Sequence, residues 1–125
     1  ADTKPEIVVR KYLHSRGFRF RLHDKALPGK PDVVLKKYNA VIFVNGCFWH
    51  YHENCKYASI PKTRTEWWKQ KLKKTKQRDQ KAVESLENLG YNVITIWECK
   101  LKKSKREKTL EEVVEQLEHF ESTLK

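Results

Sequence analysis

One segment, residues 40–55, restricts the fold of this chain more than any other. It opens with Ala-Val-Ile-Phe-Val (40–44), a run of apolar residues that are mostly β-branched or aromatic. Such a run is typical of a strand that is covered on both faces. After Asn45 and Gly46 the chain changes to cysteines, histidines and large aromatic residues as far as Cys55. Loops anchored at the end of a buried strand often carry chemistry, so we expect the functional site here.

The length and charge of the chain narrow its class. A chain of 125 residues is typical of a single domain with one modest core, and we assign residues 1–125 to one domain. The sequence has no apolar run long enough for a membrane span and no signal-peptide pattern, so we expect a soluble, intracellular protein. Its formal net charge of +11 favours a polyanionic partner, most often nucleic acid. A basic protein kept soluble by its lysines is the alternative.

Hydrophobic periodicity divides the chain into elements in the order helix, three strands, helix, strand, helix. We expect helices over residues 3–16, 63–89 and 109–124, strands over 18–22, 32–35, 40–44 and 91–97, and a basic linker over 100–108. Capping boxes at Thr3–Glu6 and Thr63–Glu66 mark two helix starts. Gly17 and Gly90 stand just past two helix ends. The order predicts an α/β arrangement with a small mixed sheet.

Cysteines and histidines are grouped in a way that suggests a metal site. Cys47, His50, His52 and Cys55 lie within nine residues, and Cys99 ends the last predicted strand. A structural Zn²⁺ takes four sulfur or nitrogen ligands, which three cysteines and either histidine would supply. The remaining histidine would then be a base or a phosphate contact. The alternative is that the cysteines are buried thiols without a metal.

Three acidic residues are candidates for catalysis. Asp32 opens a strand after Pro31, where a carboxylate suits Mg²⁺, although a solvated turn aspartate is the simpler interpretation. Asp79 falls on the apolar stripe of the helix predicted over residues 63–89, where a charge is costly without a partner. It should therefore face a metal, a histidine or a structural ion-pair partner. Glu6 is accounted for by its position in the first capping box.

Large aromatic residues gather in the same part of the sequence. Phe48 and Trp49 follow the turn at Gly46, and Trp67 and Trp68 stand at the start of the long predicted helix. Apolar side chains flanked by lysines are used by proteins to unstack and kink a duplex. Core packing is the alternative for each ring, above all for Trp68, which lies on the buried stripe.

Five sequence blocks in this order resemble the very short patch repair (Vsr) endonucleases of bacteria. They are Leu27–Asp32 (LPGKPD), Val41–His50 (VIFVNGCFWH), Pro61–Trp68 (PKTRTEWW), Arg78–Asp79 and Trp97–Cys99 (WEC). The resemblance extends from about Asp2 to Lys108. It implies a restriction-endonuclease-like fold of three layers, in which helices flank a small mixed sheet. It also implies Mg²⁺-dependent nicking of one strand of double-stranded DNA, 5′ to the thymine of a T·G mismatch left by deamination of 5-methylcytosine.

The resemblance also implies a role for each matching residue. The catalytic residues would be Asp32, His50, Asp79 and Glu6. Mg²⁺ would be bound by Asp32 and by the backbone carbonyl of Val44. A structural Zn²⁺ would be bound by Cys47, His52, Cys55 and Cys99. The residues expected to contact DNA are Phe48, Trp49 and Trp68, which intercalate beside the mismatch, together with Asn45 and Lys30.

Some features depart from the family pattern. Asn45 stands where many members have a second histidine, and the segment from His52 to Cys55 is one residue longer than in the best-known member. Members usually carry an N-terminal arm that grips DNA, so we expect either a trimmed start or weaker binding. A DNA-distortion binder of the same fold with weak or no turnover is one alternative, and a nuclease of the same fold with another DNA substrate is a second. We expect a monomer in the cytoplasm, associated with the nucleoid when bound to DNA and able to contact mismatch-repair proteins.

Overall fold

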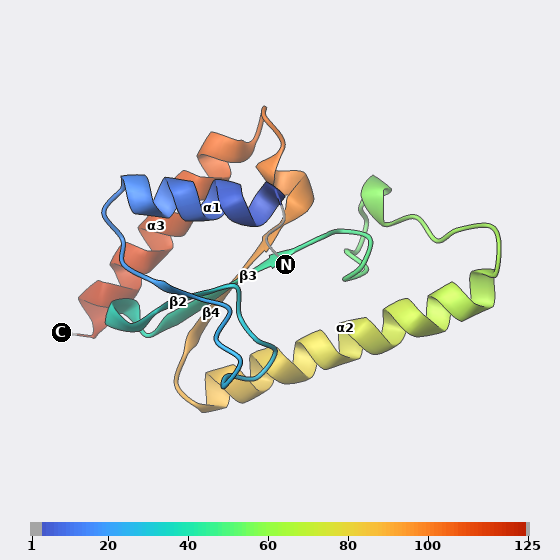
Figure 1. Ribbon diagram of the computed structural model, residues 1–125, viewed down its shortest axis with the longest axis horizontal. Coiled ribbons are helices and arrows are strands. Elements are labelled where there is room, and N and C mark those ends of the chain that lie inside the picture. Colours follow the sequence, from blue (N-terminus) through green and yellow to red (C-terminus); the bar gives the residue numbers. More distant parts are fainter. Residues whose placement is uncertain (1–3, 125) are drawn as a thin grey trace.

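A four-stranded sheet separates two layers of helices in the computed structural model, which describes residues 4–124 (Figure 1). The helices are α1 (Lys4–Ser15), α2 (Thr65–Asn88) and α3 (Arg106–Thr123), and the strands are β1 (Arg21–Leu22), β2 (Val33–Leu35), β3 (Ala40–Asn45) and β4 (Asn92–Trp97). Short 3₁₀ helices lie at η1 (Lys36–Tyr38), η2 (Lys56–Ala58) and η3 (Glu98–Leu101). The strand order is β1-β2-β3-β4, with β3 and β4 parallel and the other pairs antiparallel. This is the predicted α/β, restriction-endonuclease-like arrangement with a small mixed sheet.

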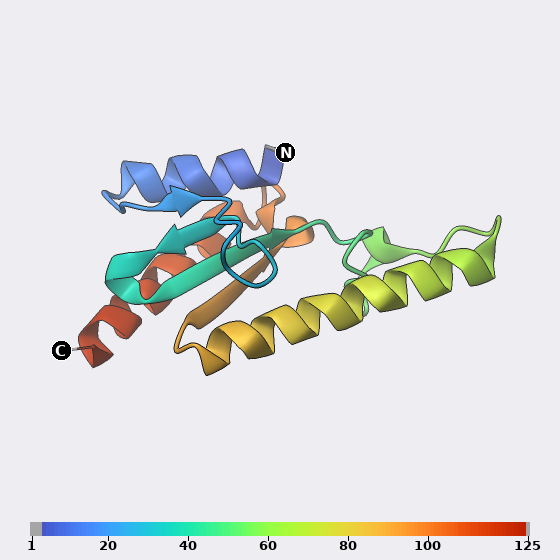
Figure 2. The same ribbon diagram turned by 60° about the horizontal axis from the view of Figure 1, so that its bottom comes forward.

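The central strand β3 is buried because helices cover both of its faces. Ile42 and Val44 pack in a core shared with α1 and α3. Val41 and Phe43 point to the other face, where Val41 packs with Leu86 of α2. Alternate residues of a strand point to opposite faces, so covering both faces requires an unbroken apolar run. Figures 1 and 2 show α1 and α3 on one side of the sheet and α2 on the other.

Both sequence-predicted helix ends at glycine are present, but the second capping box is wrong. Gly17 follows α1 with φ of +83°, and Gly90 follows α2 with φ of +94°. Helix α2 begins at Thr65, and its N-cap residue, Arg64, is left-handed with no capping side chain. The Thr65 hydroxyl donates instead to the carbonyl of Pro61, at 3.0 Å. Thr63, whose hydroxyl the capping box would need, lies one residue before the N-cap, so the box does not form. The cap expected at Thr3 lies outside the described residues.

Two other segments differ from the sequence-based expectation. The region 100–108 is not a linker, because Leu101 is buried in the core and α3 already begins at Arg106. The Arg106 Nε group donates to the Leu101 carbonyl at 3.0 Å, which joins η3 to α3. Strand β1 covers only Arg21–Leu22 of the predicted 18–22, and these two residues pair with Val34 and Val33 of β2.

Helix α2 is longer than the sheet it covers. Its N-terminal half projects past the end of β3, and the loop that follows β3 runs beside this projecting part (Figures 1 and 2). The candidate residues on the loop and on α2 are thereby brought together. None of the helices in residues 4–124 is long and apolar enough to cross a membrane.

Candidate active site and metal centre

An open cleft of about 1140 Å³ lies between α2 and the end of β3. Its lining includes most of the residues that the sequence singled out for catalysis and metal binding. These are Glu6, Lys30, Asp32, Val44, Asn45, His50, His52 and Asp79. Residues from four separate segments of the chain therefore meet at one surface depression.

Asp32 is fixed at the edge of the cleft by the backbone of β3. Its Oδ2 atom accepts a hydrogen bond from the Val44 N–H at 2.6 Å, and its own N–H donates to the Ile42 carbonyl at 3.0 Å. Asp32 precedes β2 by one residue and has the same side-chain direction as Val34, which faces α2. The carboxylate is thus held, half-buried, on the face of the sheet that the cleft occupies. A carboxylate is a hard oxygen ligand of the kind that Mg²⁺ prefers.

His50 and Asp79 form a pair across the cleft. His50 Nδ1 lies 2.7 Å from Asp79 Oδ2, and both side chains are about one-third exposed. The structure thereby identifies the partner that the buried stripe of α2 required for Asp79. With Nδ1–H donating to the carboxylate, the neutral imidazole keeps the lone pair of Nε2 for a proton. A histidine oriented in this way has the arrangement of a general base.

Glu6 has more than the helix-capping role that its sequence position suggested. Its side chain is buried, and its Oε2 atom lies 3.8 Å from His23 Nε2. His23 Nδ1 lies 4.0 Å from Asp32 Oδ1. His23 was not predicted as a site residue, because no sequence motif marks it. The signal lies in the strand register: Leu22 pairs with Val33, which sets His23 opposite Asp32.

The loop that precedes Asp32 is held against α2 by a glycine. Gly29 has φ of +73°, and a Cβ atom there would lie 2.7 Å from the Ala82 Cβ and 3.1 Å from the Phe43 ring. Only a residue without a side chain allows this approach. The next residue, Lys30, is also left-handed, with φ of +50°, and its exposed side chain lines the cleft. The close contact therefore positions both Lys30 and Asp32.

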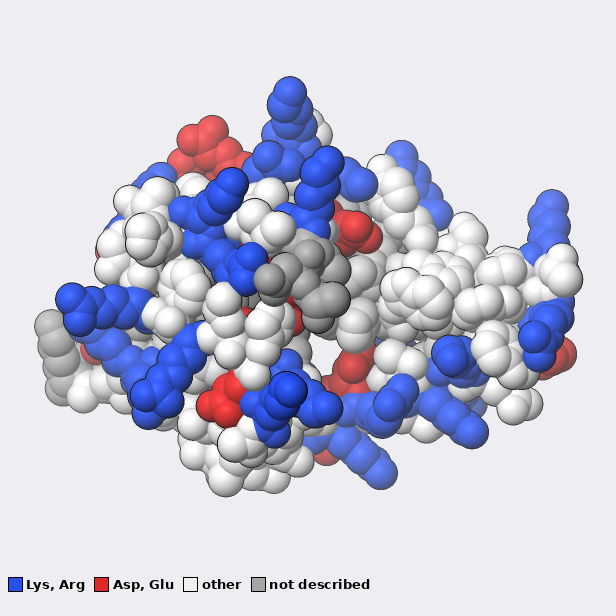
Figure 3. Space-filling view, in the orientation of Figure 1, with Lys and Arg blue, Asp and Glu red and all other residues white. Residues whose placement is uncertain are grey.

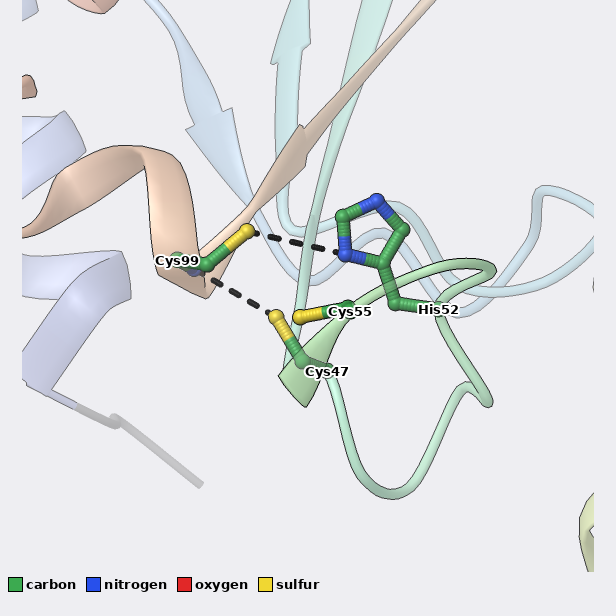
Figure 4. A group of neighbouring side chains, drawn as sticks. All are labelled: Cys47, His52, Cys55 and Cys99. Atoms are coloured by element: carbon green, nitrogen blue, oxygen red, sulfur yellow. Dashed lines mark hydrogen bonds between the residues drawn. The ribbon is translucent and has the colours of Figure 1, made fainter. Parts of the chain in front are cut away.

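The four sulfur and nitrogen ligands predicted for zinc converge at the end of β4. Cys47, His52, Cys55 and Cys99 each place one ligand atom within 4.8 Å of the others (Figure 4). Cys99 Sγ is 3.6 Å from His52 Nδ1, and the Cys99 N–H donates to Cys47 Sγ at 3.4 Å. Bonds of about 2.3 Å to sulfur and 2.1 Å to nitrogen place tetrahedral ligands about 3.6 Å apart. The donor set and its spacing fit Zn²⁺, with His52 rather than His50 as the nitrogen ligand.

The surroundings of these ligands bear on metal binding. Burial raises the pKa of the Cys47 thiol to about 12. Burial works in the same direction at Cys55, but hydrogen bonds from the Tyr57 N–H and from Cys47 outweigh it and lower the Cys55 pKa. Burial, with Lys100 and Lys76 nearby, lowers the pKa of His52, so its imidazole is neutral and able to bind a metal at pH 7. The ring also stacks on Trp97 at 4.0 Å, which fixes its orientation.

Four aromatic rings form a connected cluster next to the cleft. Phe48 contacts Trp49 and Trp68, with ring centroids 5.1 Å and 5.4 Å apart, and Trp67 contacts Trp68 at 4.9 Å. Trp49 is 55% exposed and Trp67 is 44% exposed. Phe48 and Trp68 are half-buried. The half-buried rings of Phe48 and Trp68 therefore pack against the two tryptophans that are exposed to solvent.

Basic side chains follow the length of α2. The helix carries Lys69, Lys71, Lys73, Lys74, Lys76, Arg78 and Lys81. Lys76 is paired with Glu53 at 2.7 Å. Lys and Arg side chains spread over the face shown in Figure 3, along α2 and around the rest of the molecule. The cleft and the aromatic cluster thus lie within a surface suited to a polyanion.

Comparison with known proteins gives consistent matches. The sequence profile described as DNA mismatch endonuclease Vsr matches residues 1–56. The type II nicking enzyme V.NmeAIP of Neisseria meningitidis is 50% identical over 101 residues, which make up 81% of this chain and 71% of the relative. V.XorIIP of Xanthomonas oryzae, also a type II nicking enzyme, is 45% identical over 80% of this chain and 73% of its own length. The DNA mismatch endonuclease Vsr of Escherichia coli is 40% identical over 95% of this chain and 75% of its own length.

Proposed function

Since the chain belongs to the Vsr family of DNA mismatch endonucleases, we propose that it nicks one strand of duplex DNA 5′ to the thymine of a T·G mismatch. The reaction would serve the very short patch repair of deaminated 5-methylcytosine. Family membership makes the protein a DNA endonuclease, a hydrolase of phosphodiester bonds in DNA repair. The observation that carries the narrower proposal is that the His50–Asp79 pair lies in one cleft with Asp32. His50 also directly follows the aromatic residues Phe48 and Trp49 in the sequence.

The metal requirement is supported by the ligands around Asp32. Its Oδ2 atom is engaged by the Val44 N–H, which leaves Oδ1 as the second oxygen of a half-buried carboxylate. Asp32 and the backbone carbonyl of Val44 would hold Mg²⁺, which prefers oxygen ligands. When bound, the cation would supply Lewis-acid stabilisation of negative charge on the scissile phosphate and the leaving oxygen.

The histidine pair supports a hydrolytic step without a covalent intermediate. Asp79 holds the Nδ1–H group of His50 at 2.7 Å, so His50 Nε2 accepts a proton from the attacking water. The water oxygen forms a bond to phosphorus while the bond from phosphorus to the leaving oxygen breaks. Glu6 lies behind Asp32 in the same cleft and adds negative charge that favours a cation there.

Selection of the mismatch would come from the deformability of DNA. A T·G wobble pair stacks less well than a matched pair, so a wedge formed by Phe48, Trp49 and Trp68 is inserted there at a cost lower by roughly a few kcal/mol. The exposure of Trp49 supports this role. Lys30 and the lysines of α2 supply a share of the affinity that is independent of sequence and sensitive to salt.

The proposal is tested by nicking assays on matched duplexes. We expect cleavage of a T·G duplex with Mg²⁺, and none without Mg²⁺ or on the corresponding T·A duplex. His50→Ala should abolish nicking and leave T·G binding within a few-fold. His119→Ala, which removes an exposed histidine of α3, is the matched control and should behave as the unmodified protein. Equal cleavage of T·G and T·A duplexes would contradict the substrate assignment.

A second candidate function is DNA distortion without turnover, and Asn45 favours it. Its side chain is buried at the end of β3, where it lines the cleft, and an amide cannot act as a proton acceptor in the manner of a histidine. A protein of this kind would bind T·G duplexes tightly and leave them uncut with every divalent metal. The same assays, run with binding and cleavage measured together, separate the two functions.

We also propose the wider setting of the activity. Residues 1–125 would act as one domain and as a monomer, with the Cys47–His52–Cys55–Cys99 group holding a structural Zn²⁺. The protein would work in the cytoplasm, on the nucleoid when bound to DNA, and in contact with mismatch-repair proteins. Sedimentation of the protein with and without a T·G duplex tests the monomer, and the zinc content of the purified protein tests the metal.

A further inference from the structure

A second group of possible metal ligands lies on the wall of the cleft at Asp32. Glu6, His23 and Asp32 each place one ligand atom within 4.8 Å of the others. His23 Nε2 is 3.8 Å from Glu6 Oε2, and His23 Nδ1 is 4.0 Å from Asp32 Oδ1. The side chain of Glu6 is 11% exposed and that of Asp32 is 19% exposed. The imidazole of His23 therefore lies between two largely buried carboxylates.

The backbone fixes the imidazole in this place. His23 directly follows β1 and Asp32 directly precedes β2, and the His23 N–H donates to the Asp32 carbonyl at 3.2 Å. His23 has φ of +49°, a left-handed conformation that histidine adopts more readily than most residues. Such conformations are strained and persist where the surrounding structure holds them. Glu6 comes from the first turn of α1, so three separate elements meet at this point.

We propose that His23 is a nitrogen ligand of the divalent cation held at Asp32, and that this site consequently binds Mn²⁺ and related first-row metals in clear preference to Mg²⁺. The proposal rests on the proposed function, because it concerns the cation assigned to the same cleft. A cation about 2.2 Å from each ligand needs ligand atoms roughly 3 to 4.4 Å apart. The 3.8 Å and 4.0 Å distances end on different nitrogens of the His23 ring, and a cation takes only one of them. With one ligand atom from each residue, the three ligand atoms of Glu6, His23 and Asp32 lie within 4.8 Å of one another, close to that range.

The type of ligand decides the choice of metal. Mg²⁺ prefers oxygen ligands and gives up its water reluctantly, so an imidazole adds little to its binding. First-row transition ions accept imidazole nitrogen readily, and their affinity rises from Mn²⁺ towards Ni²⁺. His23 should therefore raise the affinity of this site for first-row transition ions and leave its affinity for Mg²⁺ nearly unchanged.

The simplest competing role for His23 is that of a cation itself. A protonated imidazole between Glu6 and Asp32 would be an ion-pair bridge that neutralises the carboxylates in the absence of metal. In that case removal of His23 would strengthen the binding of every divalent cation, because a positive charge would be lost from the site. The two roles thus predict opposite effects on metal affinity.

Electron paramagnetic resonance of Mn²⁺ distinguishes these roles. The zinc-loaded protein is titrated with Mn²⁺ at pH 8, and Mg²⁺ affinity is obtained by competition. We compare the unmodified protein with His23→Asn, which tolerates the left-handed backbone, and with His23→Gln as a second variant. His14→Asn, at an exposed position of α1, is the matched control. Spin-echo modulation from ¹⁴N reports directly whether a histidine nitrogen binds the manganese.

The proposal predicts ¹⁴N modulation in the unmodified protein and its loss in both variants. It also predicts about tenfold weaker Mn²⁺ binding in the variants, with Mg²⁺ binding changed by less than about twofold. Absence of ¹⁴N modulation, an equal change for both metals, or tighter binding in the variants would overturn it. Nicking of T·G duplexes is scored separately. Failure to nick with ¹⁴N modulation retained would count against the proposed function alone, and nicking without ¹⁴N modulation would count against His23 alone.

Discussion

His50 and Asp79, which are 29 residues apart in the sequence, are joined by a hydrogen bond of 2.7 Å from Nδ1 to Oδ2. His50 stands on the loop after β3, and Asp79 stands in the middle of α2. The bond therefore connects the loop to the helix that projects beyond the sheet. Its geometry depends on how α2 is docked, so the packing of the helix sets the orientation of the histidine that we propose as the base.

Replacing Asp79 by asparagine should reduce the rate of nicking. The amide can still accept from the His50 Nδ1–H group, but it no longer stabilises the imidazolium that forms when Nε2 takes a proton. We expect kcat on a T·G duplex to fall by about 10²-fold with little change in duplex affinity. Glu87→Gln, on an exposed position of the same helix, controls for the loss of one charge. Equal kcat values for the two variants would remove Asp79 from catalysis.

Replacing Asp32 by asparagine should separate folding from activity. The side-chain carbonyl of asparagine can still accept from the Val44 N–H, so the contact to β3 is kept. The negative charge is lost, and the affinity for divalent cations falls with it. We expect nicking to be abolished and the free energy of unfolding to change by less than about 1 kcal/mol. Cleavage at the original rate would exclude Asp32 from the metal site.

Removal of zinc should destabilise the whole fold. The group of three cysteines and His52 ties the loop after β3 to the end of β4, and the closure is lost with the metal. A strong chelator should cause unfolding or aggregation. Cys99→Ser should lose the metal and at least about 2 kcal/mol of stability, or roughly 6–10 °C in Tm. Native mass spectrometry follows the zinc, and a folded, metal-free protein with three free thiols is the result that contradicts this prediction.

The elements with strong periodicity were predictable from the sequence. The apolar run of β3 fits only a buried strand, and the long apolar stripe of α2 fits only a helix. Both elements are present. Asp79 could be identified as needing a partner because it breaks that stripe. Its partner was not predictable from the stripe, because the choice between His50 and His52 depends on the path of the loop between them. Only the resemblance to a family assigned the two histidines; in the structure His50 lies beside Asp79, and His52 lies beside the three cysteines.

Features that depend on tertiary contacts were missed. The Thr63–Glu66 pattern satisfies the rule for a capping box, yet the hydroxyl of Thr65 bonds back into the preceding turn and the helix starts later. The basic residues around Leu101 suggested a linker, but the Leu101 side chain is buried in the core between β4 and α3. His23 carries no motif, and its place beside Asp32 follows from a two-residue strand whose register the sequence does not specify.

Replacing Gly29 by alanine should destabilise the loop that carries Asp32. The new Cβ would lie 2.7 Å from the Ala82 Cβ, and the backbone has φ of +73°. We expect a loss of about 1–3 kcal/mol in the free energy of unfolding. Gly17→Ala is a matched control, because φ is +83° there but nothing lies within 4 Å. Urea unfolding of both variants isolates the steric part, and equal losses would show that Gly29 is needed only for its backbone conformation.

Replacing Trp49 by alanine should weaken mismatch discrimination more than stability. The ring is 55% exposed, so its removal uncovers little of the core, and we expect the free energy of unfolding to change by less than about 1 kcal/mol. Without this part of the wedge, the ratio of T·G to T·A affinity should fall by about tenfold. The slope of affinity against salt should not change, because Trp49 makes no charge contact with phosphate. Tyr57→Ala, at an aromatic residue that is 45% exposed and outside the cluster, serves as the control. A lower Tm with the affinity ratio unchanged would identify Trp49 as a packing residue, because the cost would then arise in the aromatic cluster and not at the base step.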